Sequence, residues 1–358
     1  MIETIVIGII SIFFAYLSRY KNLDWGLKVS FSLIFFFLAF RYDFGNDYQT
    51  YFLKFESISQ LKEFSFDMLK DDFFEPGWLL INWLFRDIGF FSMTIVLAFF
   101  SSLVYYHFIA KYVPPKYYWL AVFFYVFDTN LLLVQSSAMR QSVAIILFLF
   151  SIDFLNEKKM IKYALCVIVA SFFHFSAILL LAIYFLVFVN KRLDKISGTI
   201  IFAVYVFLIF GSKILSPYLI DFVAVFSEKY QSYKDEGVLS TGLGFAFYAV
   251  VLIILLYNEK KQDREIGFIF KLVIVSLLVL PLSLVLEMFG RFWIYFTPAI
   301  IVAYPNLISK INKPLHKIIL CVILCTFTLL QFYQFFYSET YNEYFMDYKT
   351  IFSVQGWW

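Results

Sequence analysis

Long apolar runs alternate along the chain with short gaps that hold most of the charged residues. The clearest runs cover residues 31–40, 142–152, 175–189 and 318–336. A helix that crosses the hydrocarbon core of a bilayer needs about 20 mostly apolar residues. Several runs approach that length, and the shorter ones lie in closely spaced pairs. The pattern therefore predicts an all-α, polytopic transmembrane protein.

Composition supports this class and excludes others. The chain is 62% hydrophobic and 15% charged, whereas soluble domains are roughly 45–50% apolar and about 25% charged. Its 49 Phe and 26 Tyr suit lipid contact and the aromatic belts at the two membrane interfaces. The net charge of +3 gives no basic footprint, so we expect no nucleic-acid partner. The three cysteines lie inside apolar runs, and we expect no metal site.

Basic residues are concentrated in every second gap. Six alternate gaps together hold sixteen Lys and Arg but six Asp and Glu; they are 19–24, 111–116, 156–162, 190–196, 258–265 and 309–317. The other gaps hold ten basic and seventeen acidic residues; they are 41–75, 128–140, 212–242, 287–291 and 336–358. Because Lys and Arg accumulate in cytoplasmic loops, the first set is predicted to lie inside and the second outside.

This assignment changes the interpretation of the run at 161–189, because basic gaps flank both of its ends. Both ends can be cytoplasmic only if the run turns back on itself, and the natural break is at 172–176, with His174 at the turn. We expect a single integral membrane domain over residues 1–358, with about twelve full or partial crossings and both termini outside. Its long outer segments would be 41–75 and 212–242.

Three arginines at the outer ends of separate apolar runs are the first candidates for chemistry. Charge at such positions is costly, which makes it a functional hypothesis by default. Arg41, Arg140 and Arg291 could together bind a multiply charged anion, since the guanidinium fork matches phosphate oxygens. The alternative is that each is an interfacial anchor reaching for headgroups. For Arg41 the two interpretations stay equally open. A polar break before Arg140 favours a functional role there.

His174 is the candidate general base. It lies at the turn that the charge pattern requires, and a neutral imidazole facing water can accept a proton. The alternative is a buried histidine bonded to a backbone carbonyl. Further polar residues at the outer ends of the runs are candidates for substrate contact: Asp43, Asp47, Glu75, Glu287 and Tyr295. The two aspartates could orient the base or pair with an arginine, or they could cap a turn around Gly45.

Four segments, in order, resemble motifs of the EpsG family of polysaccharide polymerases. The segment 41–51 resembles its opening signature, and 137–144 contains the Arg140–Gln141 pair that heads a helix in the family. The segment 170–177 is similar to the family's histidine segment, and 291–296 to its Arg-x-x-x-Tyr-Phe element.

The resemblance implies a Wzy-type O-antigen or capsule polymerase, a metal-independent glycosyltransferase without a cofactor. It would act at the outer face of the bacterial cytoplasmic membrane, transferring a growing glycan from undecaprenyl pyrophosphate to the incoming repeat unit. Expected partners are the undecaprenyl-pyrophosphate-linked oligosaccharide, membrane lipid and a chain-length regulator. Arg41, Arg140 and Arg291 would hold pyrophosphate, Gln141 would contact substrate, and His174 would deprotonate the acceptor hydroxyl.

Three other functions stay open. An O-antigen ligase-like glycosyltransferase shares the donor chemistry and differs in the acceptor. A flippase or transporter of lipid-linked glycan would need arginines along a path through both leaflets. A membrane acyltransferase could use His174 as its base but gives the arginines no role.

Overall fold

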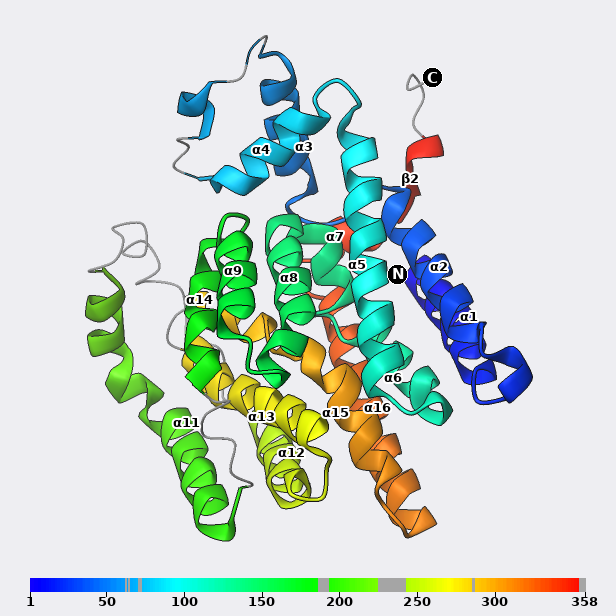
Figure 1. The fold of residues 1–358 in the computed structure, drawn as a ribbon, viewed down its shortest axis with the longest axis vertical. Coiled ribbons are helices and arrows are strands. Elements are labelled where there is room, and N and C mark those ends of the chain that lie inside the picture. The colour runs from blue at the N-terminus through cyan, green and yellow to red at the C-terminus, as the bar shows by residue number, and fades with distance from the viewer. Residues whose placement is uncertain are drawn as a thin grey trace. The chain divides into compact units, whose positions relative to one another are not determined.

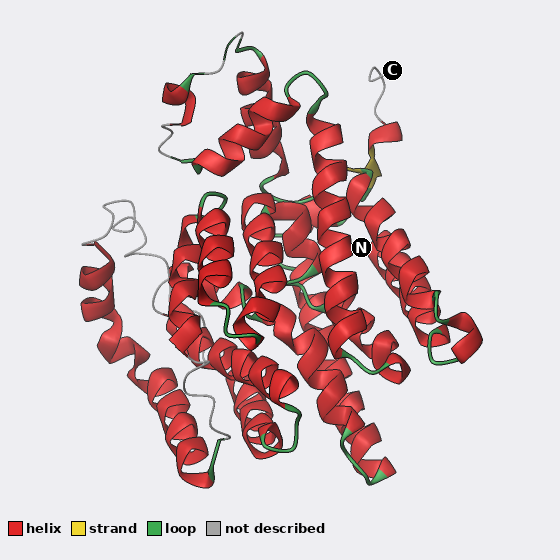
Figure 2. Ribbon diagram, in the orientation of Figure 1, coloured by secondary structure: helices red, strands yellow, loops and turns green. Residues whose placement is uncertain are grey.

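The computed structural model describes residues 1–61, 63, 65–69, 73–185, 193–224, 243–284 and 287–353. Within these residues the chain is almost entirely helical (Figure 2). Strand structure in the described part is limited to one antiparallel pairing of two-residue strands, β1 (Arg41–Tyr42) with β2 (Lys349–Thr350). The predicted all-α class is confirmed.

Residue contacts divide the chain into two compact units. Unit 1 comprises Met1–Tyr184 and Tyr304–Trp358, and unit 2 comprises Phe185–Ala303. The main helices of unit 1, labelled in Figure 1, are α1 (Ile2–Leu17), α2 (Gly26–Ala39), α3 (Tyr48–Ser59), α4 (Pro76–Phe85), α5 (Phe90–Tyr112), α6 (Tyr118–Phe127), α7 (Leu132–Ser137), α8 (Met139–Asn156), α9 (Met160–Ser171), the 3₁₀ helix η4 (Phe175–Ile183), α16 (Pro314–Phe336) and α17 (Asn342–Phe345). Unit 2 contains α11 (Lys195–Ala224), α12 (Leu243–Glu259), α13 (Arg264–Val279), η6 (Leu280–Leu284), α14 (Glu287–Ile294) and η7 (Thr297–Ala299). Helix α15 (Ile300–Ser309) begins in unit 2 and ends in unit 1.

Six helical segments of the described chain are long and apolar enough to cross a membrane. They are Lys21–Ala39, Phe90–Tyr112, Met139–Asn156, Arg264–Ser283, Phe289–Ser309 and Pro314–Phe336. Four shorter apolar helices accompany them: Ile2–Leu17, Met160–Ser171, Lys195–Gly211 and Gly244–Glu259. The chain is therefore a membrane-embedded helical protein. The total of twelve crossings and the single-domain organisation stay predictions.

Within unit 1, gaps that share a predicted side of the membrane contact one another. On the predicted outer side, the Gly45 N–H donates to the Tyr344 carbonyl at 3.1 Å, and Ser137 donates to the Asn46 side chain. The β1–β2 pairing also joins gap 41–75 to gap 336–358. These contacts agree with the grouping of gaps by charge. The outer placement of the two termini stays a prediction.

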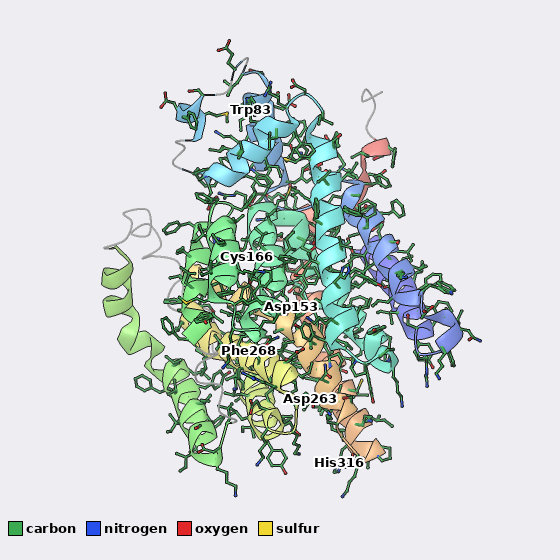
Figure 3. The ribbon with its side chains drawn as sticks, in the orientation of Figure 1. Trp83, Asp153, Cys166, Asp263, Phe268 and His316 are labelled. Carbon is green, nitrogen blue, oxygen red and sulfur yellow. The ribbon has the colours of Figure 1, made fainter. Side chains whose placement is uncertain are left out.

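The predicted inner gaps of unit 1 also meet. Lys317 Nζ donates to the Tyr117 hydroxyl at 3.1 Å, and Lys111 Nζ lies 2.7 Å from an oxygen of Asp153, labelled in Figure 3. These contacts join the gap after α5 to the gap before α16 and to the end of α8. These contacts agree with the grouping of the gaps by charge, and the side of the membrane on which they lie stays a prediction.

The predicted turn around His174 is confirmed. Helix α9 ends at Ser171, and η4 begins at Phe175 and packs back against α9. The Tyr163 hydroxyl of α9 donates to the Leu180 carbonyl of η4 at 2.5 Å. The run at 161–185 is therefore two short antiparallel helices. Of the predicted outer segment 212–242, the structure extends α11 as far as Ala224, and residues 225–242 lie outside the described part.

The predicted outer segment 41–75 forms a small hydrophobic core together with α4 and the starts of α5 and α8. Helices α3 and α4 lie at the end of unit 1 where α5 and α8 begin (Figure 1). The buried residues that pack together there are Tyr48, Tyr51, Phe55, Ile58, Phe74, Trp78, Leu79, Phe90, Met93 and Met139. Burial of these large side chains gives the outer layer its own source of stability. This core holds the neighbouring polar residues of the outer layer in position.

Candidate active site

Glu75 stands where α4 begins. Pro76 occupies the first helical position, where its missing N–H costs no hydrogen bond, and Glu75 is the N-cap residue. Among the described residues, the Glu75 carboxylate makes no capping bond to its own helix. It points instead to residues that are distant in the sequence. Oε2 lies 2.5 Å from Nη1 of Arg140, and Oε1 accepts the Phe175 N–H at 3.3 Å.

Arg140 lies just beyond a break between two helices. Helix α7 ends at Ser137, α8 begins at Met139, and Ala138 between them has ψ of 65°, outside the helical range. The Ala138 carbonyl accepts both the Ser142 N–H, at 2.9 Å, and the Ser142 hydroxyl, at 3.0 Å. The polar residues before Arg140 therefore break the helix, as predicted.

The Arg140 guanidinium is enclosed by the outer segment. Nη1 also donates to the Phe73 carbonyl at 2.9 Å, and the guanidinium carbon lies 4.8–5.8 Å from the centres of the Tyr51, Phe73 and Phe74 rings. Its side chain is 14% exposed. Burial raises the pKa of Tyr51 to about 12, against the effect of the Arg140 charge, so this hydroxyl stays neutral. Arg140 is therefore held in place by its neighbours.

His174 is the residue between α9 and η4, and its backbone is extended, with φ of −152° and ψ of 112°. Its N–H donates to the Ala170 carbonyl at 3.0 Å, and its carbonyl accepts the Ala177 N–H at 2.9 Å. Nδ1 of the half-buried ring lies 2.7 Å from the Ser176 hydroxyl. A partner on Nδ1 fixes the ring orientation.

Helix α4 reaches the His174 turn through its backbone as well. The Gly77 N–H donates to the Phe172 carbonyl at 2.8 Å, and a Cβ on Gly77 would lie 2.7 Å from that oxygen. Glycine is required here because the two backbones approach too closely for a side chain. Glu75 and Gly77 thus connect α4 to both sides of the turn.

Substitution of Gly77 by alanine is expected to destabilise the protein by about 1–3 kcal/mol, the usual cost of forcing a methyl group into a packed site. The displaced Phe172 would also shift the His174 turn. Thermal unfolding of the purified protein in detergent measures the effect. Gly198→Ala is the matched control, because a Cβ at Gly198 meets no atom within 4 Å. Equal melting temperatures for the two variants would contradict the expectation.

Arg41 lies in β1 and is buried, at 4% exposure. Its Nη1 donates to the Leu38 carbonyl at the end of α2, and its Nε is buried without an acceptor among the described residues. Arg41 is therefore not an interfacial anchor in contact with headgroups.

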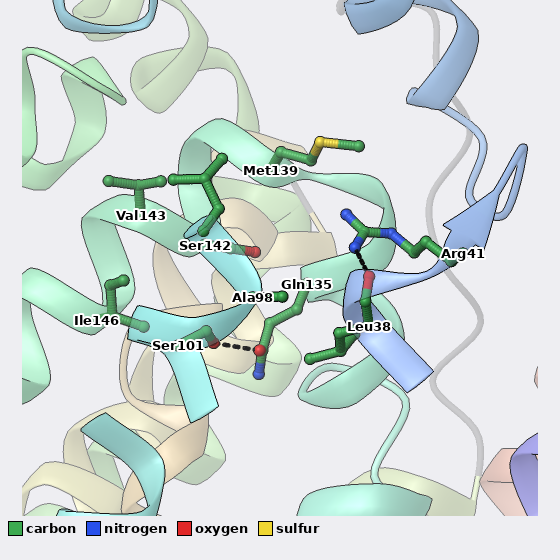
Figure 4. A pocket seen from close by; sticks show the side chains of 10 residues that line it. Leu38, Arg41, Ala98, Ser101, Gln135, Met139, Ser142, Val143 and Ile146 are labelled. Carbon is green, nitrogen blue, oxygen red and sulfur yellow. Dashed lines mark hydrogen bonds between the residues drawn. The ribbon is translucent and has the colours of Figure 1, made fainter. Parts of the chain in front are cut away.

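A small pocket lies beside Arg41 (Figure 4). Side chains of α2, α5, α7 and α8 line it together with Arg41: Leu38, Leu97, Ala98, Ser101, Gln135, Met139, Ser142, Val143 and Ile146. Ser101 donates to the Gln135 side-chain oxygen within it. Arg41 thus approaches the start of α8 from the face of Met139 and Ser142, whereas Arg140 points to Glu75. Joint binding of one anion by the two arginines stays a prediction.

The loop after β1 is shaped for close packing on the α7–α8 break. Gly45 has φ of 123°, and a Cβ there would lie 2.8 Å from the Ser136 carbonyl oxygen. Asp43 has φ of 48°, a left-handed conformation that aspartate tolerates. Asp47 is the N-cap residue of α3, and its N–H donates to Ser137 Oγ at 3.4 Å. These contacts favour the turn interpretation for Asp43 and place Asp47 against the break.

The remaining predicted residues are distributed over both units. Gln141 of unit 1 is buried beside Arg140 in the sequence, at 4% exposure. Arg291 of α14 is exposed, and Tyr295 is fully buried with its ring packed on Phe292. The Glu287 side chain lies outside the described part. Because Arg291, Tyr295 and Glu287 belong to unit 2, their participation in one site with Arg140 and His174 stays a prediction.

The structure adds residues to the site that the sequence did not single out. Tyr51, Phe73 and Phe74 enclose Arg140, and Ser176 contacts the His174 ring. Two features of the sequence could have pointed to these residues. Ser176 lies two residues after His174, and Phe73 and Phe74 directly precede Glu75.

Comparison with known proteins gives one result that covers most of the chain. Searches of curated proteins and of solved structures each found no match. The family model of the EpsG family matches residues 25–350. This match includes the Arg41 loop, Glu75, the Arg140 helix and the His174 turn. The chain belongs to the EpsG family, which indicates a membrane protein like the glycan polymerases.

Proposed function

We propose that the protein polymerises a polysaccharide at the outer face of the bacterial cytoplasmic membrane. It would transfer a growing glycan from undecaprenyl pyrophosphate to a hydroxyl of the next lipid-linked repeat unit. The observation that carries the proposal is the cluster of Glu75, Arg140 and the His174 turn at one end of unit 1. Family membership supports the same reaction class.

The chemistry needs two things from the protein. When the acceptor oxygen bonds to the anomeric carbon, the bond from that carbon to the pyrophosphate oxygen breaks, and negative charge develops on the leaving group. The Arg140 guanidinium, held in place before substrate arrives, stabilises that charge. The acceptor hydroxyl loses its proton to the His174 imidazole, which the contact of Nδ1 with the Ser176 hydroxyl holds in orientation. Arg41 and Arg291 are proposed to bind further oxygens of the pyrophosphate.

A flippase or transporter receives less support. One buried cation in the described part of unit 2, Lys271, could have lined a path through the inner leaflet. It is 8% exposed and lies 3.4 Å from Oε1 of the buried Glu259, whose Oε2 accepts the Leu193 N–H at 3.1 Å. The Lys271 charge is thus compensated by a carboxylate of the same unit.

Complementation tests the proposed function. Expression of this chain in a bacterial strain that lacks its own glycan polymerase and makes a compatible repeat unit is expected to restore a ladder of chain lengths on a glycan gel. A strain with the empty vector is the control and gives single-repeat glycan. Single-repeat glycan with the wild-type chain would contradict polymerase activity. Transfer of preformed long chains to a new acceptor, without a ladder, would favour a ligase.

A further inference from the structure

Glu75 joins three parts of unit 1 that are far apart in the sequence. Its carboxylate contacts Arg140, 65 residues away, and the backbone of Phe175, 100 residues away, while its own carbonyl accepts the N–H groups of Trp78 and Leu79 in α4. Asp, Asn, Ser and Thr are the side chains that best cap a helix N-terminus, and the Glu75 side chain makes no capping bond to the described residues of α4. Both of its contacts within the described part of the chain are to distant segments, so the side chain acts between segments and not within α4.

The two distant contacts are partly shielded from water. The side chains of Glu75 and Arg140 are 19% and 14% exposed. Long, exposed ion pairs lose much of their value to screening and side-chain entropy, whereas a shielded pair with a short hydrogen bond fixes geometry. Glu75 uses one oxygen for each partner. Movement of the His174 turn would therefore strain the Glu75–Arg140 ion pair, and movement of Arg140 would strain the hydrogen bond to the turn.

The same contacts limit what Glu75 offers to a substrate. Both of its oxygens have protein partners, and its negative charge lies beside the guanidinium that is proposed to bind pyrophosphate. A carboxylate repels an anionic ligand, so its presence weakens pyrophosphate binding at Arg140. The two contacts of the carboxylate, and not ligand binding, therefore account for a glutamate at this position.

We propose that Glu75 is a positioning residue, which sets the distance between Arg140 and the His174 turn and does not itself hold the glycan. This inference rests on the proposed function, because that function gives Arg140 and His174 their roles. It replaces the substrate contact that the sequence suggested for Glu75.

The inference predicts opposite effects of Glu75→Gln on binding and turnover. Glutamine keeps the size and one acceptor oxygen but removes the charge that opposes the ligand. Binding of an anionic probe is therefore expected to stay the same or to tighten by up to about tenfold. Polymerisation is expected to fall about tenfold or more, since a displacement of about 1 Å in a reacting group costs on the order of 100-fold.

The full-length protein in lipid nanodiscs serves for the binding measurement, with undecaprenyl diphosphate as the probe. Polymerisation is measured in cells as ladder intensity per amount of protein in the membrane. The matched control is Glu56→Gln, an exposed acidic residue on α3 of the same outer segment, which should change neither quantity. If Glu75→Gln does not reach the membrane, Glu75→Asp is used. It keeps the charge but is too short to span both partners, and it should lower the ladder without weakening binding.

Two outcomes would overturn the inference. Binding of undecaprenyl diphosphate that weakens in Glu75→Gln as it does in Arg140→Ala would mean that Glu75 supports the ligand site or the fold. A full ladder in either Glu75 variant would mean that the connection is dispensable. Failure of the proposed function has a different signature, since the wild-type protein itself would then form no ladder and bind no undecaprenyl diphosphate.

Discussion

Replacement of Arg140 by alanine is expected to abolish the glycan ladder and to weaken binding of undecaprenyl diphosphate by about 100-fold. Hydrogen bonds to a charged group contribute about 1.5–3 kcal/mol each, and the guanidinium donates them from a side chain that is only 14% exposed. Arg140→Lys should recover part of the binding, because it restores the charge but not the planar fork. Ladder intensity and the dissociation constant in nanodiscs are the two measurements.

A fold defect must be separated from the loss of an anion contact in this experiment. Arg140→Ala leaves the Glu75 carboxylate without its cation, which destabilises the outer segment whatever Arg140 binds. The double variant Glu75→Gln with Arg140→Gln removes that unpaired charge. Recovery of the melting temperature without recovery of the ladder is expected. Recovery of both would refute an anion-binding role for Arg140.

A matched control is available on the same segment. Arg86 ends α4, lies over the Trp83 ring with its guanidinium carbon 4.1 Å from the ring centre, and pairs with the exposed Asp87. It resembles Arg140 in its aromatic contact but is absent from the cluster around Glu75. Arg86→Ala should leave the ladder at wild-type intensity.

His174→Ala is expected to lower polymerisation by about 100- to 10,000-fold, the usual contribution of a general base. Binding of undecaprenyl diphosphate should be unchanged, because the acceptor and the pyrophosphate are served by different residues. His174→Gln can donate a hydrogen bond but cannot take up the proton, and it should be equally inactive.

The control for the histidine is His107 of α5. Its ring is exposed and its Nδ1 lies 2.8 Å from the Leu103 carbonyl of its own helix, on the side predicted to be cytoplasmic. His107→Ala should retain the ladder. A normal ladder in His174→Ala would remove the proposed base and leave the polymerase function itself intact.

Much of the architecture followed from the distribution of charge. The turn at His174 could be predicted because basic gaps on both sides of one apolar run allow no other path. The break before Arg140 could be predicted because four polar or small residues, 135–138, interrupt an apolar stretch. Both features depend on local composition and on the cost of burying charge in hydrocarbon, and these are readable from one sequence.

The pairing of Glu75 with Arg140 could not be predicted in this way. Several acidic residues of the outer segment were available, and the choice among them depends on how α4 packs against the His174 turn. The aromatic rings around Arg140 could not be predicted either. Tyr51, Phe73 and Phe74 are three of many rings in the chain that suit a lipid interface. Burial of Arg41 depends on its bond to the Leu38 carbonyl, a backbone acceptor that no side-chain pattern indicates.

The contacts of α4 with the His174 turn have a consequence for how the family diverges. Glu75 binds the N–H of Phe175, and Gly77 binds the carbonyl of Phe172, so the turn is recognised through atoms that every residue carries. Exchange of the exposed Phe172 and Phe175 should therefore be neutral over evolution, whereas insertion or deletion of one residue between Ala170 and Ala177 should not. Homologous sequences are expected to drift freely in side chains here while the length of the segment stays constant.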